Sequence, residues 1–395
     1  MSKKLLVIGA SILQLPAIKR AKEKGFIVAV VDMNPKAIGI KYADKFYNIS
    51  TLDKEKVYSA ARDFSADGVM TLATDMPVRS VAYATNKLNL PGISFDTACK
   101  STDKGEMIKT FKEQGVASPW FYIINDYNML KKYIKEIRYP CIIKPVDNAG
   151  SRGVMLANDE HELLKAYPYS LQCSRNGKVI IEEFMQGPEV SVETMTIDGE
   201  TTVLNITDKL TTGSPHFVEM GHSQPSILSE YDKIKITELA KQAVNAIGIN
   251  IGPAHVEIIL TAEGPKLVEL GARMGGDCIT THLVPLSTGI DMVGLTIDLL
   301  TGQKVNLNSI INLGSAIRFI SASSGIIEKI DGLEEVRKIN GVKEVCLMKH
   351  VGEKVTDINS SLDRVGYVIA QGKTAIEAMD ICEEALSKIN ILTKE

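Results

Sequence analysis

The chain has 395 residues, of which 45% are hydrophobic and 24% are charged, and its formal net charge is -3 at pH 7. This balance is typical of a globular protein large enough for two or three domains, and it excludes a disordered chain. The small net charge gives no general attraction to nucleic acid or to an anionic membrane, so we expect neither as a partner.

Two features of the chain favour a cytoplasmic protein. The N-terminus passes from two lysines into an apolar run too short for a transmembrane span, and no small-residue cleavage site precedes the fold. No two cysteines form a C-x-x-C pair, which favours free thiols in a reducing compartment over a zinc or redox site. The cysteines are Cys99, Cys141, Cys173, Cys278, Cys346 and Cys382.

In residues 1–100, short apolar strands alternate with amphipathic helical patterns. Such alternation predicts a parallel, doubly wound sheet with helices on its faces, so we expect an N-terminal Rossmann-like domain. Gly25 ends the first helical pattern at a position that suits a helix C-cap. The predicted strands are 3–10, 26–34 and 67–74, and the predicted helices are 15–25 and 78–92.

Residues 101–304 begin with a helical pattern over 101–115, which Ser101 or Thr102 is suited to cap. The pattern then turns to strands, and the dipeptide Asp198-Gly199 between alternating residues predicts a β-hairpin. We expect a central α+β domain here. Its predicted strands are 139–145, 178–184, 190–206, 255–260 and 266–270, and its later helices are 237–248 and 289–303.

Residues 305–395 predict a smaller C-terminal α+β domain. Its strands are expected at 315–323, 342–348 and 363–372, and its helices at 332–341 and 374–389. The chain therefore divides into three expected domains, an α/β domain followed by two α+β domains.

The stretch VELGARMGGD, residues 268–277, places a glutamate close to an arginine at the end of an apolar strand. If Glu269 lies opposite Glu257, the register closes a three-residue loop on Ala262, Glu263 and Gly264, with glycine in the left-handed position that it favours. Two facing carboxylates repel each other, which calls for a cation such as Mg²⁺ between them. The alternative is a register slipped by one residue, with one glutamate facing solvent.

The segment YPCIIKPVDNAGSRGV, residues 139–154, ends an apolar strand on Lys144 and continues into a loop with Gly150, Ser151 and Gly153. Small residues let backbone N–H groups approach phosphate oxygens, and Lys144 and Arg152 add positive charge. The lysine precedes the glycines, so this is not the P-loop spacing. The alternative is a tight surface hairpin with a solvated lysine.

Two further segments carry candidate contacts. The strand ending in Glu182-Glu183-Phe184-Met185 can present backbone groups to an adenine edge, and Glu189 can accept from ribose hydroxyls. Its alternative is a solvated strand end. Residues 207–225 are rich in Thr, Ser, Gly and His and predict a long polar loop beside the site. The candidates for substrate contact there are Lys209, Glu219 and His222, although His216 and His222 are also compatible with plain surface positions.

The order of these motifs resembles the ATP-grasp superfamily over nearly the whole chain: a lysine on a helix (Lys104), a strand-end lysine before a glycine-rich loop, an acidic hinge, and E…E-x-x-x-R. The C-terminal pattern SAIRFISASSGIIEKIDGLEEV…DRVGYVIAQG, with ARMGGDCITTHLVPLSTGIDM and FVEMGHSQP, is similar to the L-amino-acid ligases, which are carboxylate–amine ligases. Biotin carboxylases and purine-pathway ligases share the outline less closely at these places.

The resemblance implies an ATP-grasp fold of two lobes that clamp ATP, and it assigns roles to individual residues. Phosphate contacts would come from Lys104 and Lys144, with the Ser151-Arg152-Gly153 loop as a lid. Glu182 to Met185 would hold the adenine and Glu189 the ribose, while Glu257 and Glu269 would bind Mg²⁺. Arg273 would meet the γ-phosphate and the substrate carboxylate, with Glu219, His222, Gly275 and Gly276 lining the substrate pocket.

One position departs from the family pattern. Many ATP-grasp enzymes have E-x-N-x-R, in which the Asn is a further metal ligand, and this chain has Gly271 there. The second metal would then rest on Glu269, phosphates and water, or bind weakly. Mg²⁺ retains several waters readily, so this loss is compatible with catalysis.

The resemblance implies an ADP-forming ligase that joins a small-molecule carboxylate to an amine through an acyl phosphate, with an amino acid as a substrate. ATP and Mg²⁺ are the expected cofactors, with Mn²⁺ as a substitute, and a homodimer is the expected assembly. A purine-pathway or biotin-carboxylase-like ligase is the alternative within the superfamily. An inactive nucleotide-binding regulator is the non-enzyme alternative, with Gly271 as its main support.

An NAD-linked oxidoreductase is a rival of a different class, because residues 7–34 resemble a dinucleotide-binding βαβ unit with Asp32 at the end of its second strand. The turn reads G-A-S-I-L-Q, so the pyrophosphate site would lack two of its three glycines. The six histidines show no metal-ligand spacing, no G-x-S-x-G elbow is present and no cysteine has a nearby base, which argues against hydrolytic or zinc chemistry.

Overall fold

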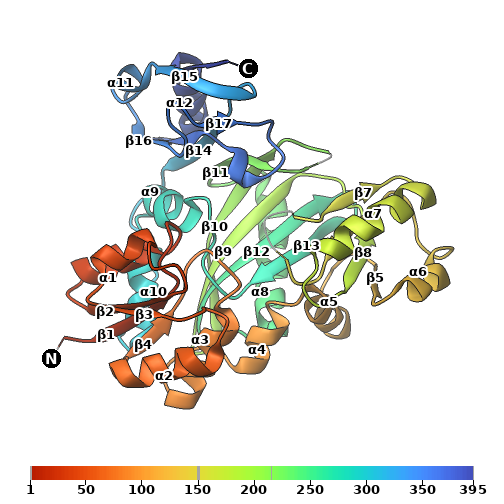
Figure 1. Cartoon of the computed structure of the whole chain (residues 1–395), viewed down its shortest axis with the longest axis horizontal. Coiled ribbons are helices and arrows are strands. Elements are labelled where there is room, and N and C mark those ends of the chain that lie inside the picture. The colour runs from red at the N-terminus through yellow and green to blue at the C-terminus, as the bar shows by residue number, and fades with distance from the viewer. Residues whose placement is uncertain (1, 149–151, 215, 395) are drawn as a thin grey trace.

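A computed structural model describes residues 2–148, 152–214 and 216–394. Its first hundred residues form a four-stranded parallel sheet in the order β3-β2-β1-β4, as the alternation of strands and helices predicts. Figure 1 shows this part in red and orange, next to the green central sheet. The strands are β1 (Lys4–Ile8), β2 (Ile27–Asp32), β3 (Lys45–Asn48) and β4 (Gly68–Met70), and the helices are α1 (Leu15–Glu23), α2 (Lys54–Phe64), α3 (Val78–Leu88) and α4 (Phe95–Lys100).

A small antiparallel sheet in the order β5-β8-β6-β7 forms the first lobe of the central region. Its buried core joins the strands to the two helices of the same segment. The strands are β5 (Phe121–Ile124), β6 (Cys141–Pro145), β7 (Met155–Ala157) and β8 (Val179–Glu183), and the helices are α6 (Tyr127–Tyr133) and α7 (Glu160–Cys173).

The second lobe is built on an eight-stranded sheet in the order β13-β12-β9-β10-β11-β14-β18-β16. Because β11 pairs with β14, the C-terminal region continues the sheet of the central region. The strands are β9 (Glu189–Ile197), β10 (Glu200–Thr211), β11 (Glu219–Gln224), β12 (Gly252–Thr261), β13 (Gly264–Gly271), β14 (Gly314–Ile320), β16 (Val342–Leu347) and β18 (Gly366–Gly372).

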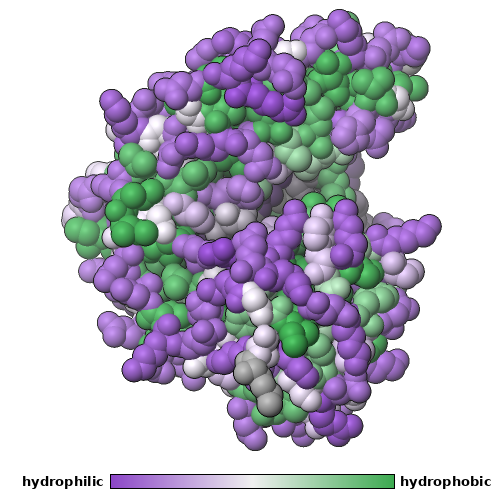
Figure 2. Space-filling model, turned by 90° about the vertical axis from the view of Figure 1, so that its left-hand side faces the viewer, coloured by the Kyte–Doolittle hydropathy of each residue, from purple (hydrophilic) through white to green (hydrophobic). Residues whose placement is uncertain are grey.

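The C-terminal region also contains a three-stranded sheet in the order β17-β15-β19, drawn in blue at the top of Figure 1. Figure 2 shows hydrophilic and hydrophobic residues interspersed over one face of the molecule, with a hollow between its upper and lower masses. The elements are β15 (Gly325–Asp331), β17 (Lys354–Val355), β19 (Asn390–Lys394), α11 (Leu333–Val336) and α12 (Ala375–Lys388).

The remaining helices connect the lobes and cover their sheets. Helix α10 (Met292–Leu300) lies between β13 and β14 in sequence but packs in the core of the N-terminal sheet. The others are α5 (Lys104–Glu113), α8 (Glu230–Ile247) and α9 (Val284–Thr288). Among the described residues, no single helix is long and apolar enough to cross a membrane; by length and composition alone, the pair Ile279–Thr288 and Met292–Leu300, bent by 110°, passes that test together.

The two faces of the large sheet differ in polarity. Because successive side chains on a strand point to opposite faces, Val190 and Val192 of β9 pack against α8 in one core, whereas Glu189, Ser191 and Glu193 lie on the other face. The partner strand β12 alternates in the same way. The large sheet therefore has one apolar face, covered by helices, and one polar face that forms a wall of the site.

Two local predictions are wrong. Asp103, and not Ser101 or Thr102, is the N-cap of α5, because its carboxylate accepts from the backbone N–H groups of Gly105 and Glu106. Residues 207–225 are also not a long polar loop. They contain the end of β10 and all of β11, which pair as antiparallel strands. The hairpin at Asp198-Gly199 is confirmed, with both residues at positive φ.

Candidate active site

Glu257 and Glu269 lie directly opposite each other on β12 and β13, which confirms the predicted register. The predicted three-residue loop is wrong, because Thr261 already pairs with Gly264 and leaves only two residues in the turn. That turn alone would place Val268 opposite Glu257. A bulge at Val268 shifts the pairing by one residue and brings the two glutamates together.

Lysines balance the charge of this glutamate pair. Lys104 Nζ lies 2.9 Å from Glu269 Oε2, and Lys209 Nζ donates to Glu257 Oε2 at 3.0 Å. Burial would raise the pKa of Glu257, but Lys209 and His255 hold that pKa well below its usual range. Burial would likewise lower the pKa of Lys104, whereas Glu269 raises it above its ordinary value. Glu257 is therefore held in the charged form.

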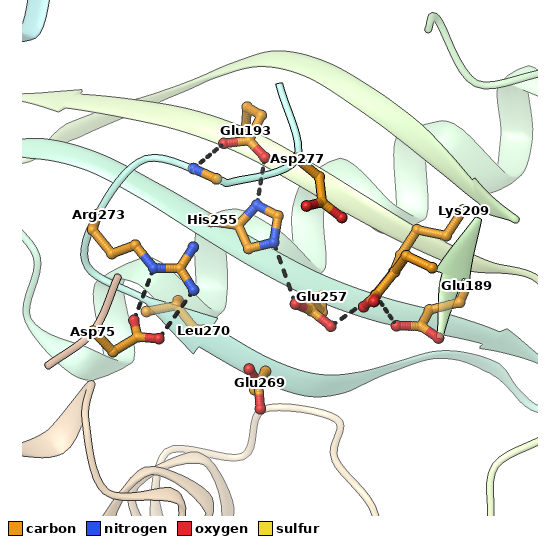
Figure 3. A network of polar contacts seen from close by, with 12 residues as sticks. Asp75, Glu189, Glu193, Lys209, His255, Glu257, Glu269, Leu270, Arg273 and Asp277 are labelled. Carbon is orange, nitrogen blue, oxygen red and sulfur yellow. Dashed lines mark hydrogen bonds and ion pairs between the residues drawn. The ribbon is translucent and has the colours of Figure 1, made fainter. Parts of the chain in front are cut away.

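Lys209 is the centre of a larger network on the polar face (Figure 3). Its side chain is 5% exposed, and its Nζ lies 2.5 Å from Glu189, 3.0 Å from Glu257 and 3.7 Å from Glu219. Burial would lower the pKa of Lys209, but the three carboxylates raise it well above its ordinary value. Burial also raises the pKa of Glu189, against the pull of Lys209. The ammonium group of Lys209 thus forms ion pairs with three carboxylates.

His255 lies between two carboxylates and was not identified from the sequence. Its Nδ1 is 2.5 Å from the fully buried Glu193, and its Nε2 is 3.3 Å from Glu257. Burial would lower the pKa of His255, but Glu193 and Glu257 raise it to about 9. Glu193 also accepts from the backbone N–H of Gly275 at 3.3 Å. The spacing H-x-E puts the side chains of His255 and Glu257 on one face of a strand, and this spacing is the sequence feature that could have identified His255 as a site residue.

Arg273 forms a two-pronged ion pair with Asp75, from the loop that follows β4. The two donating nitrogens lie 2.9 and 3.1 Å from the carboxylate oxygens. A Cβ added at Gly271 would lie 2.8 Å from Asp75 and 3.1 Å from Arg273. A larger residue at position 271 would therefore displace this pair, which gives a physical reason for the glycine at this position.

The small sheet supplies a second wall. Lys144 and Glu182 form an ion pair of 2.6 Å between side chains that are only 8% and 7% exposed. At the end of β8, Glu183 accepts from Lys266 at 2.8 Å, and the ring of Phe184 lies 6.3 Å from that of Phe217. The predicted hinge, which ends at the half-buried Met185, thus lies between the two sheets in contact with residues of the second lobe.

The glycine-rich loop is described only in part. Ser151, like Gly150, lies outside the described residues, while Arg152 and Gly153 are described. Gly153 has a φ of +83°, and an added Cβ would lie 2.7 Å from Cys173 and 2.8 Å from Pro145. This position therefore requires glycine for both its backbone conformation and its packing.

A pocket of about 260 Å³ opens beside the glutamate pair. It is bordered by Asp75 and Arg79 from the N-terminal domain, by Lys104 at the start of α5, by Arg175 before β8 and by Glu269 on β13. The pocket therefore lies where the N-terminal domain meets both lobes. Asp75 was not predicted, although it follows the carboxyl end of a parallel strand, where ligands of open α/β sheets bind.

The predicted substrate residues lie toward the C-terminal region. His222 is buried on β11, with its Nε2 3.4 Å from Asp277, and Glu219 lies 3.5 Å from Arg364. Gly275 is crowded, because an added Cβ would lie 2.7 Å from Glu193. Gly276 leads directly to Asp277. Neither Asp277 nor Arg364 was identified as a site residue from the sequence, although both belong to quoted motifs.

The donor set at the glutamate pair fits Mg²⁺. Among the described residues, no group of three or more His, Cys, Asp and Glu side chains is arranged to hold a metal ion. Mg²⁺, however, is usually bound by one or two carboxylates together with substrate phosphates. Glu257 and Glu269 are paired on adjacent strands, and Glu269 lines an open pocket, which matches that chemistry.

Comparisons with known proteins agree with this geometry. Residues 137–281 match the family model for an ATP-grasp domain, and residues 318–394 match L-amino acid ligase C-terminal domain 2. The L-amino acid ligase from Bacillus licheniformis is similar in structure, with a TM-score of 0.87, 25% identity, and coverage of 100% of this chain and 99% of that one.

Two relatives from Bacillus subtilis are similar in sequence. One is an alanine–anticapsin ligase, 30% identical over 63% of this chain, and this chain spans 57% of its length. The other is an L-arginine-specific L-amino acid ligase, 25% identical over 73% of this chain and 71% of its own length.

Proposed function

Because the chain belongs to the ATP-grasp superfamily and carries an L-amino acid ligase C-terminal domain, we propose that it is an ATP-dependent carboxylate–amine ligase with an amino acid as a substrate. The observation that carries this proposal is the facing pair of Glu257 and Glu269, with Lys104 beside it and the pocket in front of it. Phosphoryl transfer asks a protein mainly for positioning and for neutralisation of charge, and this arrangement offers both.

In the proposed first step, an oxygen of the substrate carboxylate attacks the γ-phosphorus of ATP, and the bond from phosphorus to the ADP oxygen breaks. The product is an acyl phosphate. Lys104 and Lys144 would neutralise the phosphate oxygens, and Arg273 would hold the carboxylate next to the transferred group. Arg273 is positioned for this role by Asp75, which engages two of its nitrogens and leaves further N–H groups for a ligand.

In the second step, the nitrogen of an amine attacks the acyl carbon, the bond from that carbon to the phosphate oxygen breaks, and the amine gives up a proton. The products are an amide, ADP and phosphate. The Ser151-Arg152-Gly153 loop is proposed as a lid that keeps water from the acyl phosphate, which would otherwise be hydrolysed.

Glu257 and Glu269 would hold Mg²⁺, with Mn²⁺ as a substitute, and the ion would neutralise charge on the phosphates. The segment from Glu182 to Met185 is proposed to hold the adenine. Glu189 would accept from ribose hydroxyls, and its position at the start of β9, after the hinge segment, is compatible with this role. We also propose that the chain acts as a homodimer.

The match of residues 318–394 favours an amino-acid ligase over a purine-pathway or biotin-carboxylase-like ligase. A test is to mix the protein with ATP, Mg²⁺ and pairs of amino acids or small carboxylates, and to measure ADP release together with the mass of the product. We expect ADP release that requires both partners, with an amide of matching mass. ADP release without any amine requirement, or nucleotide binding without turnover, would contradict the proposal.

A further inference from the structure

Glu193 and His255 form a row of side chains across the polar face of the large sheet, next to the row of the glutamate pair. His255 on β12 lies opposite Glu193 on β9 and opposite Gly271 on β13. Side chains two residues apart on a strand lie on the same face, so this row is the immediate neighbour of the glutamate row. Because β13 ends at Gly271, the loop that follows it, here called the Arg273 loop (residues 272–277), begins directly beside the pair of Glu193 and His255.

The carboxylate of Glu193 holds the backbone of the Arg273 loop. Its Oε2 accepts from the backbone N–H of Gly275 at 3.3 Å, while its Oε1 lies 2.5 Å from Nδ1 of His255. A Cβ added at Gly275 would lie 2.7 Å from Oε1 of Glu193 and 2.7 Å from Nδ1 of His255. The loop backbone therefore lies directly against the pair, and this close approach requires glycine at position 275.

Other contacts tie the Arg273 loop to different parts of the molecule. Arg273 engages Asp75 of the N-terminal domain, and the fully buried Met274 packs in the core of the N-terminal sheet. Thr280 donates to the backbone carbonyl of Gly275 at 2.8 Å. Compared with these contacts, the hydrogen bond from Gly275 to Glu193 is the one that connects the loop to the large sheet.

His255 joins this pair to the proposed metal site. Its Nδ1 faces Glu193 and its Nε2 lies 3.3 Å from Glu257, so one ring lies between two carboxylates (Figure 3). The side chains of His255 and Glu193 are only 8% and 0% exposed. A buried ion pair usually adds little stability over apolar residues of similar volume. The geometry that the pair imposes on its neighbours therefore explains its presence better than stability does.

We propose that Glu193 and His255 are positioning residues of the active site. Glu193 fixes the Arg273 loop through Gly275, and His255 fixes Glu193 relative to Glu257, the proposed ligand of Mg²⁺. The inference rests on the proposed ligase function, in which a carboxylate held by Arg273 attacks a phosphate held by Mg²⁺. Reacting atoms must approach to about 3–3.5 Å, and a misplacement of about 1 Å can reduce the rate by about 100-fold.

The order of the contacts predicts which substrate each residue affects. Glu193 contacts the Arg273 loop, so its loss should impair use of the carboxylate substrate. His255 also contacts Glu257, so its loss should impair both the carboxylate substrate and the Mg²⁺–nucleotide complex. Residues that merely filled space in the protein interior would show no such difference.

The first experiment measures hydrogen–deuterium exchange in the Arg273 loop and needs no substrate. In Glu193→Ala, exchange of the Gly275 amide should be at least about 10-fold faster, because that amide has lost its acceptor. In Glu193→Gln, the new carbonyl oxygen accepts from Gly275 and the new amide group donates to Nδ1 of a neutral His255, so most of the protection should be recovered. Glu200→Ala, an exposed acid on the neighbouring strand β10, is the matched control.

The second experiment uses L-alanine as the carboxylate probe and L-alaninamide as the amine, whose blocked carboxyl cannot be activated. In Glu193→Ala, kcat/KM for L-alanine should fall about 10- to 100-fold, whereas the affinity for the Mg²⁺ complex of a non-hydrolysable ATP analogue should change by less than about 3-fold. Glu193→Gln should recover most of the loss. In His255→Ala, both quantities should fall, because Glu257 also loses a contact. Glu200→Ala should match the wild type.

Gly275→Ala provides the same test without removing a buried side chain. Its added methyl group would lie too close to the pair, so the loop should be pushed away from Glu193. We expect the pattern of Glu193→Ala, with faster exchange in the loop and a reduced kcat/KM for L-alanine at nearly unchanged nucleotide affinity. This variant keeps the inference testable if thermal unfolding shows that Glu193→Ala does not fold.

The outcomes separate the inference from the function on which it rests. If the Gly275 amide exchanges in Glu193→Ala as it does in the wild type, or if nucleotide affinity falls as much as kcat/KM for L-alanine, Glu193 does not position the loop, while the ligase function stands. If no carboxylate supports amine-dependent ADP release in the wild type, the ligase function fails, and the exchange experiment still decides whether Glu193 holds the loop.

Discussion

The two sheets that border the site handle buried charge in different ways. On the small sheet, Lys144 and Glu182 form one isolated pair, with each side chain almost fully buried. On the large sheet, Lys209 is shared by Glu189, Glu219 and Glu257. The first wall is neutral by itself, whereas the second carries more negative than positive charge.

This difference indicates what each wall requires from a ligand. A phosphate that approaches Lys144 must compete with Glu182, so the affinity gained there is limited by the pair that is broken. On the large sheet three carboxylates share Lys209, so a bound cation neutralises negative charge that this lysine alone leaves unbalanced. We therefore expect substitutions on the large sheet to have larger effects than those on the small sheet.

The largest effect is expected from Glu269→Gln or Glu257→Gln, which removes one of the two facing carboxylates. ADP release should fall by about 100- to 1,000-fold, because a charge-stabilising group of the transition state is lost. Circular dichroism should show an unchanged fold. Glu200→Gln, an exposed acid beside the hairpin turn, is the control and should retain activity. Near-normal turnover in either glutamate variant would remove the metal assignment.

The next effect concerns stability and contrasts the two lysines. Lys209→Met leaves three carboxylates without their shared cation and should cost about 3–5 kcal/mol in the free energy of unfolding, measured with urea. Adding Glu189→Gln should restore little of this loss, because two acids remain. By contrast, Lys144→Met should be largely rescued by Glu182→Gln, since that pair is isolated. Equal rescue on both walls would show that the contrast is wrong.

A pH effect is expected from the large sheet through His255. Its pKa in the folded protein is raised to about 9 from an ordinary 6.5 by Glu193 and Glu257. The stabilisation is therefore complete below pH 6.5 and is lost as the pH rises through 9, on the order of 3 kcal/mol in all. Urea unfolding at pH 6 and pH 9.5 should show this loss in the wild type and not in His255→Gln. An equal slope in both proteins would contradict the assignment.

The smallest effect is expected on the small sheet. Lys144→Ala should weaken binding of a non-hydrolysable ATP analogue by only about 10-fold, because in the wild type Glu182 already competes with the phosphate for this lysine. Calorimetric titration measures the affinity, and Lys144→Arg should retain most of it. An unchanged affinity in Lys144→Ala would exclude a phosphate role for this lysine.

Local patterns were sufficient to predict most elements of the fold. Alternation of apolar residues located the strands of the parallel sheet, and the Asp198-Gly199 turn located a hairpin, because these signals act between neighbours in the chain. The pairing of Glu257 with Glu269 was predicted correctly from an incorrect loop, because the bulge at Val268 shifts the register by one residue. The position of a bulge is difficult to predict from the residue types of a strand.

The sequence by itself determined the type of fold and several chemical groups of the site, including Lys104 on a helix, Lys144 at the end of a strand and the glutamate pair on adjacent strands. Tertiary structure alone decided their partners. Asp75 reaches Arg273 across 198 positions of sequence, and Arg364 reaches Asp277 across 87. The polar composition of residues 207–225 predicts a loop, yet the side chains of Lys209 and His222 are buried. A polar residue can be buried at low cost only where other segments supply its hydrogen-bond partners. The hydrophobic periodicity of one segment does not identify those partners.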